Sequence, residues 1–124
     1  MGTLMYAGTS VEFDDRVLTH LQIVIVQKFR RGEAFLLSWL NDPSSGHGRA
    51  SMWLTPAVPV FFSFNGSRVP ALDTGWISRL STSADGPRGL VVTDAEGEPL
   101  RVLAPGHQPH TVAGGALEVP RGRR

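Results

Sequence analysis

Residues Asp14–Gly32, DDRVLTHLQIVIVQKFRRG, carry the signals for both ends of one helix. Asp14 and Asp15 supply an N-cap and negative charge where the helix dipole favours it. Basic residues followed by glycine are typical of a helix C-terminus. The β-branched run in the middle of the segment would also suit a strand. Its length and its capped ends favour a helix over Arg16–Arg31.

The two faces of this helix differ. At about 100° per residue, one face gathers large apolar residues that we expect in the core: Val17, Leu18, Leu21, Val24, Ile25 and Phe29. The opposite face carries Arg16, His20, Gln27 and Arg31, together with Ile23 and Val26. The core does not need these last two apolar side chains. We therefore predict a non-catalytic interaction module, a homodimer that self-associates through this outer face.

Strand patterns lie on both sides of the helix. Before it, Thr3–Ala7 and Ser10–Phe13 predict an N-terminal hairpin around Gly8-Thr9. After it, three runs predict an antiparallel meander: Glu33–Leu40, Arg49–Thr55 and Val58–Phe64. A second helix is expected from an Asp73 cap to about Ser83, followed by a final strand at Leu90–Val92. The class is α+β, and we expect both helices on one face of the sheet because each has one apolar stripe to bury.

The chain has 124 residues, which suits one domain. We assign residues 1–104 to that domain and expect the Gly-, Pro- and Arg-rich segment 105–124 to be disordered. There is no cysteine, so disulfides and thiolate chemistry are excluded. No apolar run approaches the length of a membrane span and no secretion signal is evident, so we expect a cytoplasmic protein.

The basic residues are eleven arginines and one lysine, Lys28. No glycine-rich phosphate loop precedes this lysine, which argues against most nucleotide-transfer mechanisms. The histidines do not have metal-ligand spacing, and no Gly-x-Ser-x-Gly elbow is present. We expect no catalytic site, no metal and no cofactor.

An arginine–aromatic set gives the alternative function, a small nucleic-acid-binding or DNA-associated accessory protein. Arg49 and Trp53 lie four residues apart on one expected strand, so both face the solvent side of the meander. Aromatic side chains flanked by arginines can stack bases and hold phosphates. The full candidate set is Lys28, Arg30, Arg31, Arg49, Trp53, Arg68, Arg121, Arg123 and Arg124. Burial of Trp53 under the second helix is the more frequent outcome for a tryptophan.

Several motifs resemble a family of small actinobacterial and phage proteins of unknown function. They include Lys28-x-Arg30-Arg31-Gly32-Glu33-x-Phe35, Trp53-Leu54-x-Pro56-x-x-Pro59 and Phe64-x-Gly66-Ser67-Arg68-x-Pro70, within residues 1–92. Genome annotation often labels such proteins ATP-dependent DNA ligase. A ligase of that type attaches AMP to the lysine of a Lys-x-Asp-Gly motif. Lys28 is followed by Phe29, Arg30 and Arg31, so this motif is absent.

Overall fold

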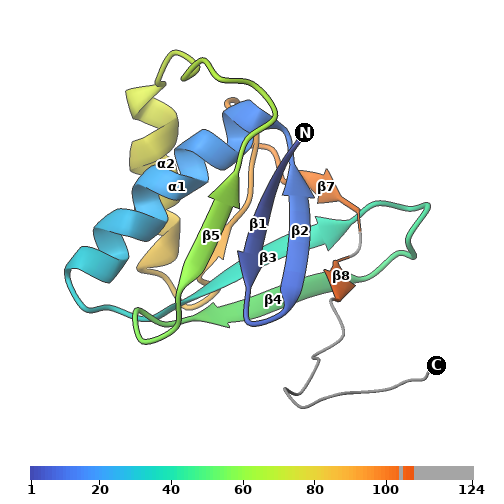
Figure 1. Ribbon diagram of the computed structural model, residues 1–124, viewed down its shortest axis with the longest axis horizontal. Coiled ribbons are helices and arrows are strands. Elements are labelled where there is room, and N and C mark those ends of the chain that lie inside the picture. The colour runs from blue at the N-terminus through green and yellow to red at the C-terminus, as the bar shows by residue number, and fades with distance from the viewer. Residues whose placement is uncertain (104, 108–124) are drawn as a thin grey trace.

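The computed structural model describes residues 1–103 and 105–107 and has two helices and two sheets (Figure 1). The helices are α1 (Asp15–Arg30) and α2 (Thr74–Ala84). The strands are β1 (Gly2–Tyr6), β2 (Thr9–Phe13), β3 (Phe35–Asn41), β4 (Arg49–Leu54), β5 (Val60–Ser63), β6 (Leu90–Val91), β7 (Arg101–Val102) and β8 (Gly106–His107). The predicted α+β class is confirmed.

Both helices begin at the aspartates that the sequence predicts. The Asp14 side chain accepts a hydrogen bond from the Arg16 N–H, and the Asp73 side chain accepts one from the Trp76 N–H. These bonds satisfy backbone donors that have no partner within the helix. Gly32 follows α1 with φ +71°, a conformation that glycine adopts without a side-chain clash.

The predicted three-stranded meander is wrong in one connection. β3 and β4 pair antiparallel as expected, but β5 pairs with β1, with Leu4 opposite Phe62. The chain therefore crosses from one sheet to the other between β4 and β5. The first sheet has the order β5-β1-β2-β8, and the second has the order β4-β3-β6. We name them the hairpin sheet and the β3–β4 sheet.

The final strands also differ from expectation. β6 pairs with β3 in parallel, and β7 pairs with β3 farther along, also in parallel. Backbone hydrogen bonds between Asp94 and Glu98 and between Leu100 and Val92 close a turn around Gly97 that leads from β6 to β7. Of the segment 105–124, which we expected to be disordered, residues 106 and 107 form β8 and pair with β2. Residues 108–124 lie outside the described part of the chain.

The core lies where α1, α2 and the inner faces of the two sheets meet. In Figure 1 both helices lie above β3 and β4, and α1 also contacts β1. Buried side chains come from every layer, including Leu4, Leu18, Leu37, Trp76 and Leu90. Phe13 of the hairpin sheet meets Trp39 of the β3–β4 sheet edge to face, with ring centroids 6.3 Å apart. This contact joins the two sheets directly.

Candidate nucleic-acid interface

One face of the β3–β4 sheet is solvent-exposed, and we call it the outer face. Strand pairing defines it, because residues paired directly across two strands point to the same side. Its members are Leu36, Ser38 and Leu40 from β3, Arg49, Ser51 and Trp53 from β4, Val91 from β6 and Arg101 from β7. The alternate residues, such as Phe35, Leu37 and Leu54, are buried against the core.

A shallow cavity of about 530 Å³ lies over this face. Leu36, Leu40 and Val91 give it an apolar floor, and Ser38 and Ser51 add hydroxyl groups. The loop before β6 and the turn before β7 complete its rim with Pro87, Arg88 and Pro99. The volume is within the usual range for small-molecule sites, and the lining combines apolar and polar groups as binding sites do.

Trp53 stands exposed on this face. Its side chain is directly across from Leu36 and is 61% accessible. Burial beneath the second helix, the commoner fate of a tryptophan, does not occur here. The reason is that α2 packs against β6 and β3 from the core side, through Trp76, Leu80 and Ala84. Trp53 therefore offers an open aromatic surface beside Arg49.

Three arginines share the outer face or its rim: Arg49, Arg88 and Arg101. Within residues 1–103 and 105–107, no carboxylate lies within ion-pair distance of any of the three. The Arg101 side chain donates to the carbonyl oxygen of Asn41 at 3.5 Å, and those of Arg49 and Arg88 have no hydrogen-bond partner among the described residues. Their charge is therefore available to an anion. Of these three arginines, the sequence predicted only Arg49 on this face. Arg88 and Arg101 reach it because β6 and β7 pair with β3.

The remaining candidates for nucleic-acid binding do not join this face. Arg68 is exposed in the connection between β5 and α2, which runs over the top of Figure 1, away from β3 and β4. Arg30 is exposed at the end of α1, and Arg31 binds Glu33 at 3.4 Å. Arg121, Arg123 and Arg124 lie outside the described residues.

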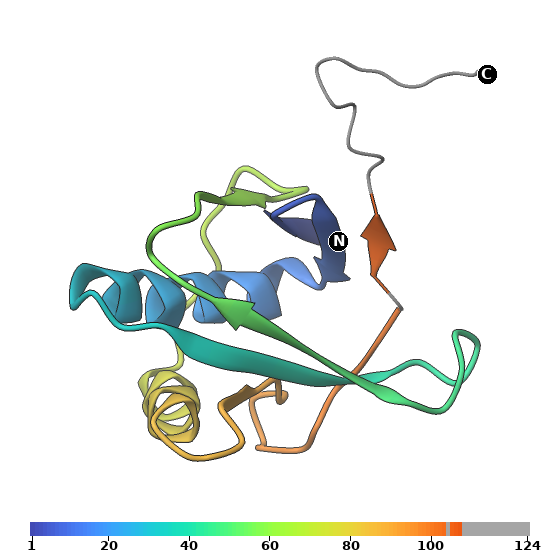
Figure 2. The same ribbon diagram turned by 90° about the horizontal axis from the view of Figure 1, so that it is seen from below.

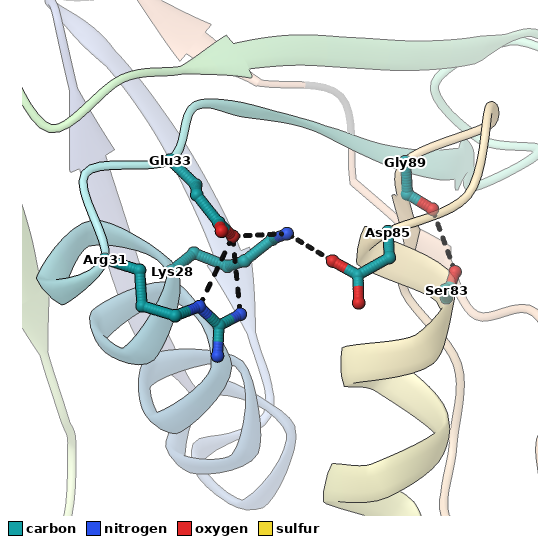
Figure 3. Close-up of polar contacts among 6 residues, drawn as sticks. All are labelled: Lys28, Arg31, Glu33, Ser83, Asp85 and Gly89. Atoms are coloured by element: carbon teal, nitrogen blue, oxygen red, sulfur yellow. Dashed lines mark hydrogen bonds and ion pairs between the residues drawn. The ribbon is translucent and has the colours of Figure 1, made fainter.

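Lys28 cannot serve as a phosphate contact, so its prediction as one is wrong. Lys28 is only 5% accessible to solvent. Its Nζ donates one hydrogen bond to Glu33 Oε1 at 3.0 Å and another to Asp85 Oδ1 at 2.5 Å (Figure 3). Asp85 caps the end of α2, so this cluster ties the C-terminal ends of the two helices together. The only lysine of the chain is a structural residue. The sequence contained no signal for the Asp85 contact, which spans 57 positions.

The Lys28 cluster should make stability sensitive to acid. The hydrogen bonds from Lys28 lower the pKa of Glu33 and of Asp85 below their ordinary 4.5 and 3.8. Carboxyls with a lowered pKa stabilise the fold above their unfolded pKa, and that contribution is lost as pH falls through the folded value. We expect the unfolding free energy to decline below about pH 4.5.

In urea titrations, Lys28→Met should make that decline shallower, whereas Arg30→Met should leave it unchanged. Equal acid profiles for wild type and Lys28→Met would contradict this role.

His20 is buried, so its prediction for the outer face of the first helix is wrong. It is 0% accessible and stacks on Trp76 with ring centroids 4.2 Å apart. Its Nε2 accepts the Asp73 N–H at 2.9 Å, so its Nδ1 carries the hydrogen and donates to the Arg16 carbonyl at 2.7 Å. His20 therefore joins α1 to the start of α2, a joint that periodicity within one helix does not reveal.

The rest of that predicted interface is only partly open. Arg16, Gln27 and Arg31 are exposed, and the Arg16 guanidinium lies 5.1 Å from the centroid of the Trp76 ring. Ile23 and Val26 are half-buried. Neither is among the apolar side chains packed against the core. The face therefore presents two half-buried apolar residues among exposed polar ones.

Comparison with known proteins places the chain in a family. A family model described as a domain of unknown function, DUF7882, matches residues 1–95. The chain belongs to the DUF7882 family. No curated protein and no solved structure gives a significant match. The DUF7882 match runs from β1 through β6, so it includes Arg49, Trp53 and Arg88 but ends before Arg101.

Two further properties of the DUF7882 chain concern metals and membranes. Among residues 1–103 and 105–107, no three histidine or acidic side chains gather as a metal site would require. Neither helix in the described part of the chain has the length and apolar character needed to cross a membrane.

Proposed function

We propose that this protein is a non-catalytic module that binds single-stranded nucleic acid on the outer face of the β3–β4 sheet. The exposure of Trp53 carries the proposal. A large aromatic side chain on an open sheet face leaves apolar surface in contact with water. A nucleic-acid base stacked on the ring would remove that surface from water. Every base has a flat π-face, so this contact needs no particular sequence.

The arrangement around Trp53 supports the same ligand. Trp53 and Arg49 lie four residues apart on β4, or about 13 Å along the strand. A base on Trp53 therefore leaves room for neighbouring phosphates at Arg49 and, across the cavity, at Arg88. Ser51 and Ser38 lie on the same face, where their hydroxyl groups can bond to base edges. Net charge is only +1, so attraction comes from this face and not from the whole molecule.

The expected result is salt-sensitive binding that depends on Trp53. With a labelled single-stranded oligonucleotide at about 50 mM salt, where phosphate contacts are strong, Trp53→Ala should weaken affinity about 5- to 100-fold, the value of one stacked base. Arg49→Gln should reduce the slope of log affinity against log salt by about 0.7. Fluorescence anisotropy measures both quantities.

Phe61 supplies the matched control for that experiment. It is 58% accessible but lies on β5 of the hairpin sheet, so Phe61→Ala should leave affinity unchanged. Absence of binding to any DNA or RNA strand at low salt would refute the proposal. Equal losses from Phe61→Ala and Trp53→Ala would show adsorption to exposed aromatic groups in general.

Self-association is the second function that we propose, as the sequence suggested. The outer face of α1 supports it less than expected, because His20 is buried and Ile23 and Val26 are half-buried. The outer edge of β4 gives a different surface for self-association.

A further inference from the structure

Among residues 1–103 and 105–107, no strand pairs with the outer side of β4, so β4 forms an open edge of the β3–β4 sheet. It is the outermost strand in the order β4-β3-β6, and in the view from below it lies on the near side of the sheet (Figure 2). Natural proteins protect such edges with proline, lysine, bulges or covering segments. β4 has the sequence RASMWL, which contains no proline and a single charged side chain, Arg49, at its first position. Its edge can therefore accept another strand.

The backbone groups on this edge can be assigned. The Asn41 N–H donates to the Gly48 carbonyl, so this facing pair is a hydrogen-bonded one. Facing pairs alternate in an antiparallel ladder, so Ala50, Met52 and Leu54 direct their N–H and C=O groups toward β3. The N–H and C=O groups of Arg49, Ser51 and Trp53 consequently point away from β3. The same three residues direct their side chains to the outer face.

We propose that the β4 edge pairs with the β4 edge of a second copy, antiparallel about a two-fold axis at Ser51. In this register Ser51 faces its own counterpart, and Arg49 of each copy faces Trp53 of the other. All three residues with outward backbone groups then form hydrogen-bonded pairs, which gives about six interchain bonds. The interface is self-complementary, as a two-fold dimer requires.

The side chains favour this partner and this register. Arg49 has no carboxylate partner among the described residues, and Trp53 is exposed, so each copy offers a free cation and a free ring. Pairing them gives two cation–π contacts across the axis. A shift of two residues in either direction would move Trp53 or Arg49 opposite residues outside the partner's β4 and would lose both contacts. It would also keep fewer backbone bonds.

Pairing would extend the β3–β4 sheet through both copies and bring their two outer faces onto one surface. Pairing at this edge does not require nucleic-acid binding, and the oligomeric state is measured on the protein alone. Failure of either proposal therefore leaves the other standing.

Sedimentation of the full chain at high micromolar concentration tests the interface. The wild type should be a dimer, and Ser51→Pro should be a monomer because proline removes the central outward N–H. That N–H makes no bond to β3, so circular dichroism should show a retained fold. Ile23→Glu, on the outer face of α1, should remain a dimer. A monomeric wild type would overturn the proposal, and so would dissociation by Ile23→Glu with Ser51→Pro still dimeric.

A cysteine variant tests the register without disturbing the strand. The chain has no cysteine, so Ser51→Cys adds a single thiol. Hydrogen-bonded antiparallel partners have Cα atoms about 5.5 Å apart, within the range that a disulfide spans. Mild oxidation at low micromolar concentration should yield a covalent dimer for Ser51→Cys. Ser63→Cys, exposed on the outer strand β5 of the hairpin sheet, should remain monomeric. Equal cross-linking of the two variants would exclude the proposed register.

Discussion

Trp76→Ala should lower the free energy of unfolding by about 3–5 kcal/mol, as large-to-small core substitutions of tryptophan do. Trp76 is the largest of the fully buried side chains and is 1% accessible. It anchors α2 to α1 by stacking on His20. Its removal would leave a cavity at this joint and expose the bond between His20 and the Asp73 N–H.

Chemical denaturation followed by far-UV circular dichroism measures this loss. Trp53→Ala is the matched control, since the same substitution at an exposed site should change stability by less than about 0.5 kcal/mol. Similar losses for the two variants would mean that Trp76 does not organise the core. A large loss for Trp53→Ala alone would mean that the outer face is covered.

Gly89→Ala should also be strongly destabilising, by about 3 kcal/mol, the sum of backbone strain and overpacking. Gly89 has φ +73°, in the left-handed region. A Cβ at this position would lie 2.3 Å from the Leu36 carbonyl oxygen and 2.6 Å from the Leu36 Cβ. Since Leu36 belongs to the central strand β3, the clash cannot be relieved by a side-chain rotation. Either β6 or β3 would have to move.

Gly32→Ala separates the two contributions. Gly32 has a similar φ of +71°, but a Cβ there would meet nothing within 4 Å. Only the backbone strain applies, so we expect a loss of about 1 kcal/mol. Thermal and urea unfolding of both variants give the comparison. Losses of equal size would show that the close approach of β6 to β3 is not needed for stability.

Local chemistry made much of this fold predictable. Both helices begin at the predicted aspartates, because a cap depends on residues within one turn. The alternation in β4 placed Arg49 and Trp53 on one face, and the structure has them there. Of the core residues expected in α1, Leu18, Leu21 and Ile25 are fully buried.

The placement of β5 depends on distant residues, so the sequence around it did not reveal it. Pro56 and Pro59 suit a tight connection whether or not the next strand returns to the same sheet. The structure shows what anchors the crossing: the Tyr6 hydroxyl accepts the Thr55 N–H at 2.8 Å and donates to the Thr55 carbonyl at 3.3 Å. Strand propensity carries no information about such a partner, which lies 49 residues away.

The candidate site was predictable only in part for a related reason. Alternation assigns Trp53 to a face but cannot say whether another element covers that face. A helical wheel considers α1 alone, so it predicted that His20 is exposed to solvent. In the structure Trp76 of α2 covers His20. Arg88 and Arg101 come from the loop before β6 and from β7, whose parallel pairing with β3 the sequence did not indicate.

The crossing of β5 into the hairpin sheet also dictates an order of events during synthesis. β1 and β2 are the first strands to leave the ribosome, but β1 must wait for β5 to pair along its second edge, with Leu4 meeting Phe62. Contacts so distant in sequence slow folding. Neither sheet is a continuous stretch of chain, so a cut between β4 and β5 would leave two fragments that each lack strands of the hairpin sheet. We expect co-expressed fragments to recover the fold together and neither to hold it alone.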